Sequence, residues 1–436
     1  MQAIILFKES SLFKLCGLSL LKRNFYLLRS KKIRQINILA EEKNFSLLKE
    51  EKEKAKKIGV RVKLVKPVDL ASLIRQVADD FFLIIDGDCV FDPALLEVVL
   101  HGKKTSLCCD SQAKKECAGR SPKVVFEDGR VQKIGDSLTG WKGVYAGIAL
   151  CERKVLLELQ DELSHHLNWP DCLNKVLKKE DVRCLDISLS SFYRSDLRKN
   201  VKPFWYRISS PKDLKIAKKH FIEGTQKRTL DVLAWYIHRP IEKKLIYYLS
   251  ELPITPNQLT ILTNVVAFLI TFLFLKGQLL IASLLTLAVN ILDGLDGKQA
   301  RAKGMVTKLG ELEHSLDALY EQSWYIAFSW AVFNLTGSLL PLGLCLVMLL
   351  FDTFSRHCSM QFRMVMKVPL ADYAEFDRAF RRFDGRRNIY VLYILAGVLS
   401  GFPLYSLFAM TAHAILTAIV YLVRSAKHMH SADVEG

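Results

Sequence analysis

The stretch NILDGLDGKQARAKGMVTKLGELEHSLDALYEQ, residues 290–322, is the most informative segment for the structure of the C-terminal half. It places several carboxylates, an arginine and glycines between apolar runs that are long enough to cross a membrane. Charged side chains at membrane depth are costly, and those that occur there usually line a polar cavity and have a function. The stretch therefore predicts a polar site inside a membrane-embedded helical bundle.

The chain of 436 residues changes composition near Glu251, from a mixed, lysine-rich half to a half of long apolar runs that begins at Ile254. Several of these runs approach the ~20 residues that a membrane-spanning helix needs. The runs cover residues 258–275, 278–300, 311–334, 337–359, 388–404 and 404–424. We predict a soluble domain followed by an all-α bundle of six transmembrane helices.

Basic residues concentrate in alternate loops of this bundle. After the second run come Arg301, Lys303 and Lys308, and after the last run come Arg424 and Lys427. After the fourth run come Arg363, Lys367, Arg378, Arg381, Arg382, Arg386 and Arg387. The loops between them carry no charge apart from Lys276. Because Lys and Arg favour cytoplasmic loops, we expect a multi-pass protein of the cell (inner) membrane, with both termini and the soluble half in the cytoplasm.

The formal net charge of +17 is typical of proteins that bind anionic lipid headgroups or a nucleic acid. The sequence has no RNA-binding signature and no zinc-finger spacing, so we expect membrane lipids as a partner and no nucleic acid. The ten cysteines form no C-x-x-C pattern, and we expect them to be buried thiols in a reducing compartment.

Short apolar strands alternate with helical segments in the N-terminal half. The strand candidates are AIILF (3–7), QINIL (35–39), VRVKLV (60–65) and FFLIID (81–86), and the helix candidates are SLLKRNFYLL (19–28) and ALLEVVL (94–100). Such alternation predicts a Rossmann-like α/β domain around a largely parallel sheet. The segment VVFEDGRVQKI (124–134) predicts a hairpin that turns at Asp128 and Gly129.

The segment LDVLAWYIHRPIEKKLIYYLSEL (230–252) is strongly amphipathic and mixes aromatic residues with Lys and Arg. This mixture is typical of a helix that lies in the membrane interface, and packing on the soluble domain is the alternative. We place the soluble domain at residues 1–212, a linker with this juxtamembrane helix at 213–253, and the bundle at 254–425.

The charged residues of the opening stretch fall at helical spacing. One face of the second apolar helix carries Asp293, Asp296, Gly297, Ala300 and Arg301. Asp317 and Glu321 share a face of the following helix, which is antiparallel to the second. Four carboxylates then converge on one cavity, which suits Mg²⁺, Mn²⁺ or Ca²⁺, and a metal beside an arginine can hold a diphosphate. The alternative is that these acids only pair with nearby Lys and Arg.

The pattern Asp-x-x-Asp-Gly-x-x-Ala-Arg, followed by a glycine and two more spaced acids, resembles the signature of the CDP-alcohol phosphotransferases. ITPNQLTILTNVVA (254–267) is similar to the start of that family's first membrane helix, and HRPIEKKLIYYLSELP (238–253) to its juxtamembrane helix. The resemblance covers residues 225–424. It implies an enzyme that uses Mg²⁺ or Mn²⁺, with two ions as one option. An acceptor hydroxyl attacks the phosphorus of a CDP-alcohol that is distal to cytidine, and CMP leaves.

The resemblance assigns roles by position. It implies that the metal ligands are Asp293, Asp296, Asp317 and Glu321, with Glu321 also the general base. It implies that the CDP moiety is contacted by Gly297, Ala300 and Arg301.

Two features depart from the family pattern. The family's third acid comes four residues after its second glycine, and that offset from Gly310 leads to His314. Aligning Asp317 and Glu321 with the acidic pair implies about three extra residues, nearly one helical turn. The alignment also puts Glu313 in place of the glycine, where it would crowd the nucleotide, and puts Glu in place of Asp at position 321. We expect an active but unusual site.

The basic loop before the fifth helix is the expected place for an acceptor's phosphate. FDGRRNIY (383–390) resembles a family segment in which an Asp precedes an Arg. The candidates for phosphate contact are Arg386 and Arg387, with Lys308 as a third. The alternative is that these residues set the topology and touch lipid headgroups.

The soluble half resembles a sugar-phosphate nucleotidyltransferase, with Asp86 and Asp88 of FFLIIDGDCVFDP (81–93) as candidate metal ligands at the end of a strand. The glycine-rich phosphate loop is missing, because ILFKESSLFKLCG (5–17) has no glycine until its last residue. The late acid is missing too, because WYRIS (205–209) supplies an arginine instead. We expect a degenerate domain that is kept for folding or regulation.

The fusion as a whole resembles the bifunctional inositol-phosphate cytidylyltransferase and di-myo-inositol-phosphate-phosphate synthase family. The resemblance implies a CDP-alcohol donor and an acceptor that is a phosphorylated polyol or a lipid alcohol, with a homodimer as a candidate assembly. A catalytically silent membrane protein whose cytoplasmic domain binds a partner or nucleotide is the alternative. A transporter is disfavoured because the charges lie near one membrane boundary, away from the midplane.

Overall fold

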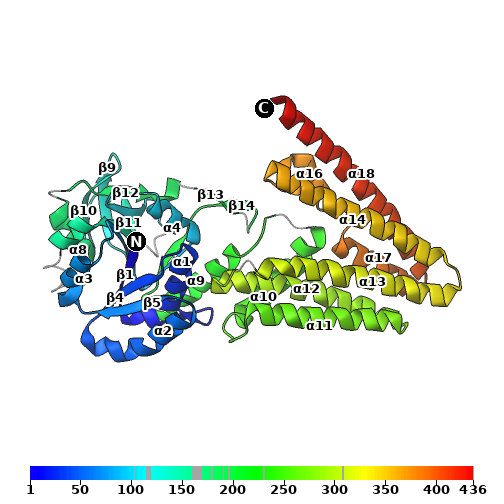
Figure 1. Ribbon diagram of the computed structural model, residues 1–436, viewed down its shortest axis with the longest axis horizontal. Helices are drawn as coiled ribbons and strands as arrows, with labels where there is room; N and C mark the ends of the chain where they lie inside the picture. The colour runs from blue at the N-terminus through cyan, green and yellow to red at the C-terminus, as the bar shows by residue number, and fades with distance from the viewer. Residues whose placement is uncertain are drawn as a thin grey trace. The chain divides into compact units, whose positions relative to one another are not determined.

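The computed structural model describes residues 1–102, 104–113, 119–159, 169–177, 180–189, 191–194, 197–228, 231–306 and 309–435. The chain forms two compact units (Figure 1). The first combines Met1–Ser195 with Lys199–Gly224, and the second combines Asp196–Arg198 with Thr225–Gly436. We describe each unit by itself.

A nine-stranded sheet forms the centre of the first unit, in the order β5-β4-β1-β6-β11-β8-β12-β10-β9. Its strands are β1 (Gln2–Leu6), β4 (Gln35–Leu39), β5 (Arg61–Val65), β6 (Phe81–Asp86), β8 (Ser106–Asp110), β9 (Lys123–Glu127), β10 (Arg130–Gly135), β11 (Gly143–Glu152) and β12 (Arg183–Asp186). The strands β5, β4, β1 and β6 run parallel, and β11 is antiparallel to β6. Three two-stranded pairs are β2 (Lys14–Leu15) with β3 (Leu18–Ser19), β7 (Cys89–Phe91) with β15 (Trp205–Arg207), and β13 (Phe192–Arg194) with β14 (Lys199–Val201). The four predicted parallel strands are thus confirmed.

Helices cover both faces of this sheet, which explains why β1 is apolar and buried from Ala3 to Leu6. Ala3 and Ile5 belong to the core on one face, whereas Ile4 and Leu6 belong to the core on the other. The first face is covered by α1 (Leu20–Ser30), α2 (Phe45–Lys57), α4 (Pro93–Leu100) and α9 (Pro211–Gly224). The second face is covered by α3 (Leu70–Gln76), α6 (Arg153–Glu158) and α8 (Trp169–Val176). The result is an α/β domain, as predicted, but its sheet is mixed and not largely parallel, because β9, β10 and β11 run antiparallel to their neighbours.

The last helix of this unit, α9, lies beyond the domain boundary expected at residue 212. Phe221 on α9 packs edge-to-face on Phe204, with ring centroids 5.4 Å apart, and the guanidinium of Arg23 lies over the Phe221 ring. These contacts hold α9 in the α/β unit.

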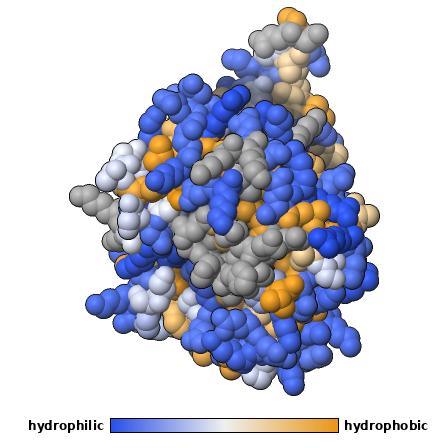
Figure 2. Space-filling view, turned by 90° about the vertical axis from the view of Figure 1, so that its left-hand side faces the viewer, coloured by the Kyte–Doolittle hydropathy of each residue, from blue (hydrophilic) through white to orange (hydrophobic). Residues whose placement is uncertain are grey.

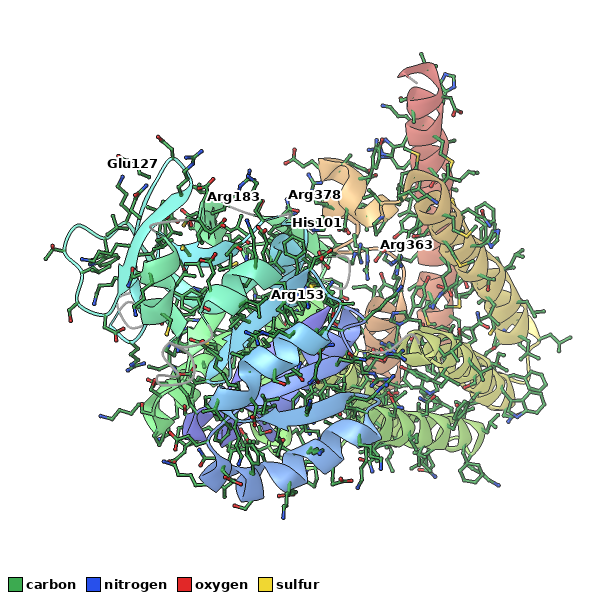
Figure 3. The ribbon with its side chains drawn as sticks, turned by 60° about the vertical axis from the view of Figure 1, so that its left-hand side comes forward. His101, Glu127, Arg153, Arg183, Arg363 and Arg378 are labelled. Carbon is green, nitrogen blue, oxygen red and sulfur yellow. The ribbon has the colours of Figure 1, made fainter. Side chains whose placement is uncertain are left out.

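The predicted hairpin is formed by β9 and β10. Asp128 and Gly129 have φ angles of 48° and 73°. Positive φ at both central residues is the geometry of a two-residue hairpin turn whose twist matches that of the strands. Glu127 lies at the end of this hairpin (Figure 3).

Polar residues dominate the face of the molecule shown in Figure 2, and hydrophobic residues appear on it only as scattered patches. The described cysteines are free thiols and are buried, except for the half-buried Cys358. Their burial confirms the expectation for the part of the chain that the structure describes.

The second unit is helical. Its longer helices are α10 (Arg239–Leu249), α11 (Pro256–Leu275), α12 (Leu279–Lys303), α13 (Glu313–Thr336), α14 (Leu340–Met366), α17 (Arg387–Ser400) and α18 (Pro403–Glu435), and the short α15 (Leu370–Tyr373) and α16 (Glu375–Phe380) follow α14. Among the described residues, four helices are long and apolar enough to cross a membrane, namely α11, α12, α14 and α18. The 24 residues of α13 and the 14 residues of α17 are not among them, so the count of six spans stays a prediction.

The segment before the bundle forms a π-helical turn, η5 (Ala234–His238), which continues into α10. One side of this segment exposes Tyr236 and Tyr248, while Glu242 and Ile246 are buried on the other. This distribution is what an interfacial helix needs.

The two helices that carry the charged stretch are joined by a short connection. Gly304, at φ 65°, ends α12 with its backbone N–H bound to the carbonyls of Ala300 and Arg301. Both α12 and α13 pack on α11, and Trp324 of α13 donates its indole N–H to the carbonyl of Ala267 at 2.7 Å. This packing brings the polar ends of α12 and α13 together.

Candidate active site

Two pairs of carboxyl groups meet between α12 and α13. The carboxyl group of Asp293 faces that of Asp317, and the carboxyl group of Asp296 faces that of Glu313. Carboxylates that face each other repel unless a cation or a proton lies between them. The geometry therefore requires a cation or a shared proton at this place.

The ligand atoms of Glu313, His314 and Asp317 all lie within 4.8 Å of one another. His314 Nδ1 is 3.6 Å from Asp317 Oδ2. Carboxylate oxygens in this number are the donors that Mg²⁺ and Mn²⁺ prefer, so the residues present fit such an ion. The family pattern gives Glu313 only a crowding role. The spacing of four residues between Glu313 and Asp317 indicates, however, that both side chains share one helix face.

Asp296 is held in place from two sides. The hydroxyl of Thr260 on α11 donates to Asp296 Oδ2 at 2.7 Å, and the backbone N–H of Gly297 donates to Asp296 Oδ1 at 2.6 Å. Asp296 itself is 2% exposed. A carboxylate fixed in this way loses little conformational freedom when it binds a ligand.

Arg387, at the start of α17, supplies positive charge to the cluster. Its guanidinium bonds to Asp293 and to the hydroxyl of Tyr320, and its Nη1 lies 3.3 Å from Glu321 Oε1. Of the candidate acceptor residues, Arg387 thus lies at the carboxylates.

Arg386 points elsewhere, since its Nε lies 3.0 Å from Asp384 and its Nη2 lies 3.0 Å from the hydroxyl of Tyr421. The remaining acceptor candidate, Lys308, lies outside the described residues.

Glu321 is buried among arginines. Arg356 of α14 donates to its Oε2 at 2.5 Å, and the same arginine bonds Asp352 at 2.7 Å through Nε. Sequence reasoning missed Arg356 and Asp352, although both stand in an apolar run. The rule that intramembrane charges are functional would have singled them out.

The residues expected to contact CDP lie together on α12. A Cβ added at Gly297 would lie 3.3 Å from Arg301 Nη1, and Ala300 is half-buried beside them. Arg301 Nε donates to the carbonyl of Thr225 at 2.8 Å. Lys227 lies near Arg301, and its burial, together with that neighbouring charge, lowers the pKa of its ammonium group.

The juxtamembrane helix α10 is tied to the same helix. Glu242 forms a buried ion pair with Lys298. Gln299 donates to the carbonyls of Leu249 and Ile254, and Lys303 donates to that of Ile254 at 2.9 Å. These contacts join α10 to the helix that carries the motif.

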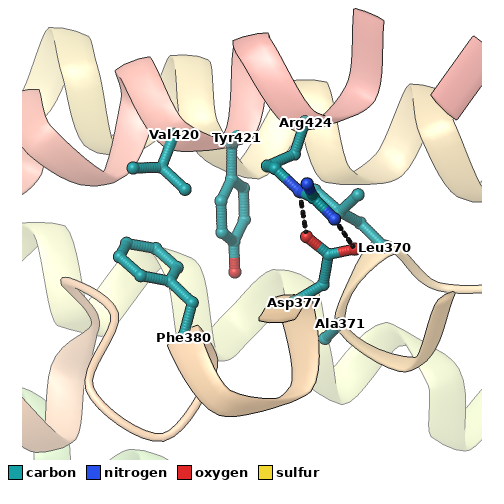
Figure 4. A pocket seen from close by; sticks show the side chains of 7 residues that line it. All are labelled: Leu370, Ala371, Asp377, Phe380, Val420, Tyr421 and Arg424. Carbon is teal, nitrogen blue, oxygen red and sulfur yellow. Dashed lines mark hydrogen bonds and ion pairs between the residues drawn. The ribbon is translucent and has the colours of Figure 1, made fainter. Parts of the chain in front are cut away.

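A separate small cavity lies between α16 and α18, lined by Leu370, Ala371, Asp377, Phe380, Val420, Tyr421 and Arg424 (Figure 4). Its space of about 10 Å³ holds about one water molecule. Arg424 Nε lies 2.7 Å from Asp377 Oδ1 across it, so it is a structural ion-pair site.

In the α/β unit, Asp86 and Asp88 lie at the end of β6 and both bind Arg207. Arg207 Nη2 is 2.5 Å from Asp86 Oδ2, and Nη1 is 2.9 Å from Asp88 Oδ1. Burial lowers the pKa of this guanidinium, but the negative charges around it, including those of both carboxylates, outweigh burial and raise the pKa well above its usual value.

Comparison with known proteins matches residues 253–419 to the family described as CDP-alcohol phosphatidyltransferase. The bifunctional IPC transferase and DIPP synthase of Aquifex aeolicus is 25% identical over 230 residues, which are 52% of this chain and 49% of that protein. The protein of the same name from Thermococcus kodakarensis is 22% identical over 367 residues, which are 82% and 79% of the two chains.

The chain matches about half the length of the Aquifex relative. The archaetidylinositol phosphate synthase of Pyrococcus horikoshii is 35% identical over 88 residues, 20% of this chain and 46% of that protein. Among solved structures, the inositol-1-phosphate CTP transferase from T. maritima is similar with a TM-score of 0.38 and 18% identity, covering 49% of this chain and 90% of that one.

Proposed function

Because residues 253–419 match the CDP-alcohol phosphatidyltransferase family, we propose that this chain is an integral-membrane phosphotransferase that transfers an alcohol phosphate from a CDP-alcohol to an acceptor hydroxyl and releases CMP. The observation that carries the proposal is the pairing of Asp293 with Asp317 and of Asp296 with Glu313 between α12 and α13. Phosphoryl transfer of this kind depends on positioning and on compensating negative charge.

The proposed metal site consists of Asp293, Asp296, Asp317 and Glu313, with His314 beside them. In this set Glu313 takes the place of Glu321, which the family pattern implies as a ligand, because Glu321 is paired with Arg356 and Arg387. A bound Mg²⁺ or Mn²⁺ would neutralise charge on the diphosphate and on the leaving CMP. Gly297, Ala300 and Arg301 border this site and are proposed to contact the CDP moiety.

Arg387 is the proposed partner of an acceptor phosphate. It already bonds to Asp293 and lies 3.3 Å from Glu321, so an acceptor bound to it would hold its hydroxyl near the site. The acceptor oxygen forms a bond to the phosphorus distal to cytidine. The bond from that phosphorus to the bridging oxygen breaks, and CMP leaves with the electron pair. Glu321 is the proposed acceptor of the hydroxyl proton.

We also propose that both termini and the α/β unit face the cytoplasm. Arg363 on α14 and Arg378 on α16 belong to the strongly basic loop between the fourth and fifth apolar runs (Figure 3). Basic loops of this kind stay on the cytoplasmic side. The relatives named as IPC transferase and DIPP synthase and as archaetidylinositol phosphate synthase favour inositol phosphate as the polar group of a substrate.

The test is CMP release by the purified full-length protein in detergent with Mg²⁺ or Mn²⁺. CDP-inositol and CDP-diacylglycerol are offered in parallel, each with and without inositol phosphate. We expect release only when metal and acceptor are both present. Asp293→Asn should abolish it, while Glu375→Gln, which neutralises an exposed acid of the same unit, should not. Activity in Asp293→Asn would refute the metal site, and no release from any combination would favour a catalytically silent membrane protein.

A further inference from the structure

Asp86 and Asp88 in the α/β unit are the carboxylates expected to bind a divalent metal. Both are buried, at 4% and 2% exposure, and Arg207 between them is 4% exposed. Two carboxylates that are separated by one residue at the end of a buried strand would suit a divalent cation in a nucleotidyltransferase. The guanidinium of Arg207 contacts both of them, so the residues present do not fit a metal at this place.

The geometry of this contact is specific. The Nη1 atom of Arg207 is 2.9 Å and 3.1 Å from the two oxygens of Asp88, and Nη2 is 2.5 Å from Asp86. The remaining donor, Nε, lies 3.0 Å from the hydroxyl of Ser121. The planar guanidinium thereby satisfies both carboxylates at once, as a bidentate donor does.

The chain segment after β1 packs against Asp88 and Gly87. Lys8 Nζ lies 3.0 Å from Asp88 Oδ2, and the backbone N–H of Lys8 donates to the hydroxyl of Ser11. Ser11 is fully buried, and a Cβ added at Gly87 would lie 2.5 Å from its Oγ. The segment that would cradle a triphosphate in a nucleotidyltransferase instead packs directly on the residue between the two carboxylates.

We propose that Arg207 is a permanent internal cation that takes the place of the divalent metal at Asp86 and Asp88, so that this chain does not make its own CDP-alcohol. The proposal rests in part on the proposed function, which requires a CDP-alcohol. A separate CTP-dependent cytidylyl transfer must then supply the donor. In that reaction, a phosphate oxygen of the alcohol phosphate bonds to the α-phosphorus of CTP. The bond between the α- and β-phosphates breaks, and pyrophosphate leaves.

The first experiment measures Mn²⁺ bound to the purified full-length protein by electron paramagnetic resonance. The single variant Asp88→Asn should bind the same number of Mn²⁺ ions as the wild type. In an Arg207→Ala background the protein should bind one additional Mn²⁺, which adding Asp88→Asn should remove. A bound ion in the wild type that disappears with Asp88→Asn would overturn the proposal, as would an Arg207→Ala variant that gains no ion.

Stability gives a second measurement on the same variants. Arg207→Ala leaves two buried carboxylates without a partner, and we expect the melting temperature of the α/β unit to fall by about 10 °C. Added Mn²⁺ should recover part of that loss in Arg207→Ala and none in the wild type. If Arg207→Ala does not fold, Arg207→Lys replaces it, because lysine keeps the charge but not the bidentate contact. Mn²⁺ should then stabilise Arg207→Lys as well, by a smaller amount than expected for Arg207→Ala.

The catalytic consequence is tested separately from the phosphotransferase. The wild type is given CTP, inositol 1-phosphate and Mg²⁺, and pyrophosphate is measured, while CMP release from pre-made CDP-inositol is followed in a parallel sample. We expect no pyrophosphate. Pyrophosphate release would overturn the inference whatever the CMP assay shows. Absence of CMP release together with absence of pyrophosphate would count against the phosphotransferase and not against the role of Arg207.

Discussion

The hydroxyl of Thr260 on α11 donates a 2.7 Å hydrogen bond to Asp296 on α12. The two residues are 36 positions apart in the chain, and their helices pack side by side. Asp296 also faces Glu313 of α13, so its carboxyl group contacts both neighbouring helices, α11 and α13, at the place where the proposed metal binds.

Replacing Thr260 by Val removes the hydroxyl and keeps the shape of the side chain. Outer partners of metal ligands contribute about 10- to 100-fold to metal affinity, so we expect Thr260→Val to raise the Mn²⁺ concentration for half-maximal CMP release by that factor. Thr260→Ser keeps the donor and should behave like the wild type. Equal metal requirements in the Val and Ser variants would show that the bond does not position Asp296.

Glu313 and Glu321 are expected to fail in different ways. Glu313→Gln removes a proposed metal ligand, so it should raise the metal requirement, and saturating Mn²⁺ should restore part of the activity. Glu321→Gln removes the proposed base, so it should lower kcat by roughly 10²- to 10⁴-fold with the metal requirement unchanged. Titrations of CMP release with Mn²⁺ distinguish the two.

Glu321→Asp restores the residue type expected from the family pattern and should recover part of kcat. A change of metal requirement in Glu321→Gln instead would assign Glu321 to the metal and leave the base unidentified.

Gly294 lies where α12 meets Glu242 of α10. A Cβ at this position would collide with the Glu242 carboxyl group, whose Cδ is 2.7 Å away, and would push it from its buried partner Lys298. An unpaired buried ammonium is costly, so we expect Gly294→Ala to lower the melting temperature by about 5–10 °C. Gly343→Ala on α14 is the matched control, because nothing lies within 4 Å of its added Cβ. Similar melting temperatures for the two variants would contradict the role of the ion pair.

We expect His238, in the segment before α10, to make the stability of the helical unit sensitive to acid. Burial lowers its pKa in the folded protein, and the nearby charge of Arg387 acts in the same direction, while Asp231 opposes them. The folded pKa is therefore below the unfolded value of about 6.5. The stabilisation by neutral His238 is complete above that pH and is lost as the pH falls below it.

Melting curves between pH 7.5 and pH 5.5 measure this loss. We expect a smaller decrease in His238→Gln than in the wild type, because glutamine does not titrate in this range. An equal decrease in both proteins would place the acid-sensitive group elsewhere.

Many local features of this protein can be predicted from its amino-acid sequence. Apolar runs of about 20 residues predict membrane helices because length and hydrophobicity are local properties. The spacing of Asp293, Asp296 and Arg301 predicts one polar helix face, because the α-helix turns once in 3.6 residues. The continuously apolar strands around Ile4 and Ile84 predict a sheet that is buried on both faces, and the structure pairs these two strands in parallel.

The contacts between distant side chains follow from the packing of the helices and strands. Glu313 and Glu321 both lie in the first half of α13. Their spacing alone does not predict that Glu313 faces Asp296 while Glu321 pairs with Arg356. That outcome depends on the rotation and axial shift of α13 against α12 and α14. The pairing of Arg207 with Asp86 joins residues 121 positions apart. The contacts between such residues arise from packing, which local spacing does not encode.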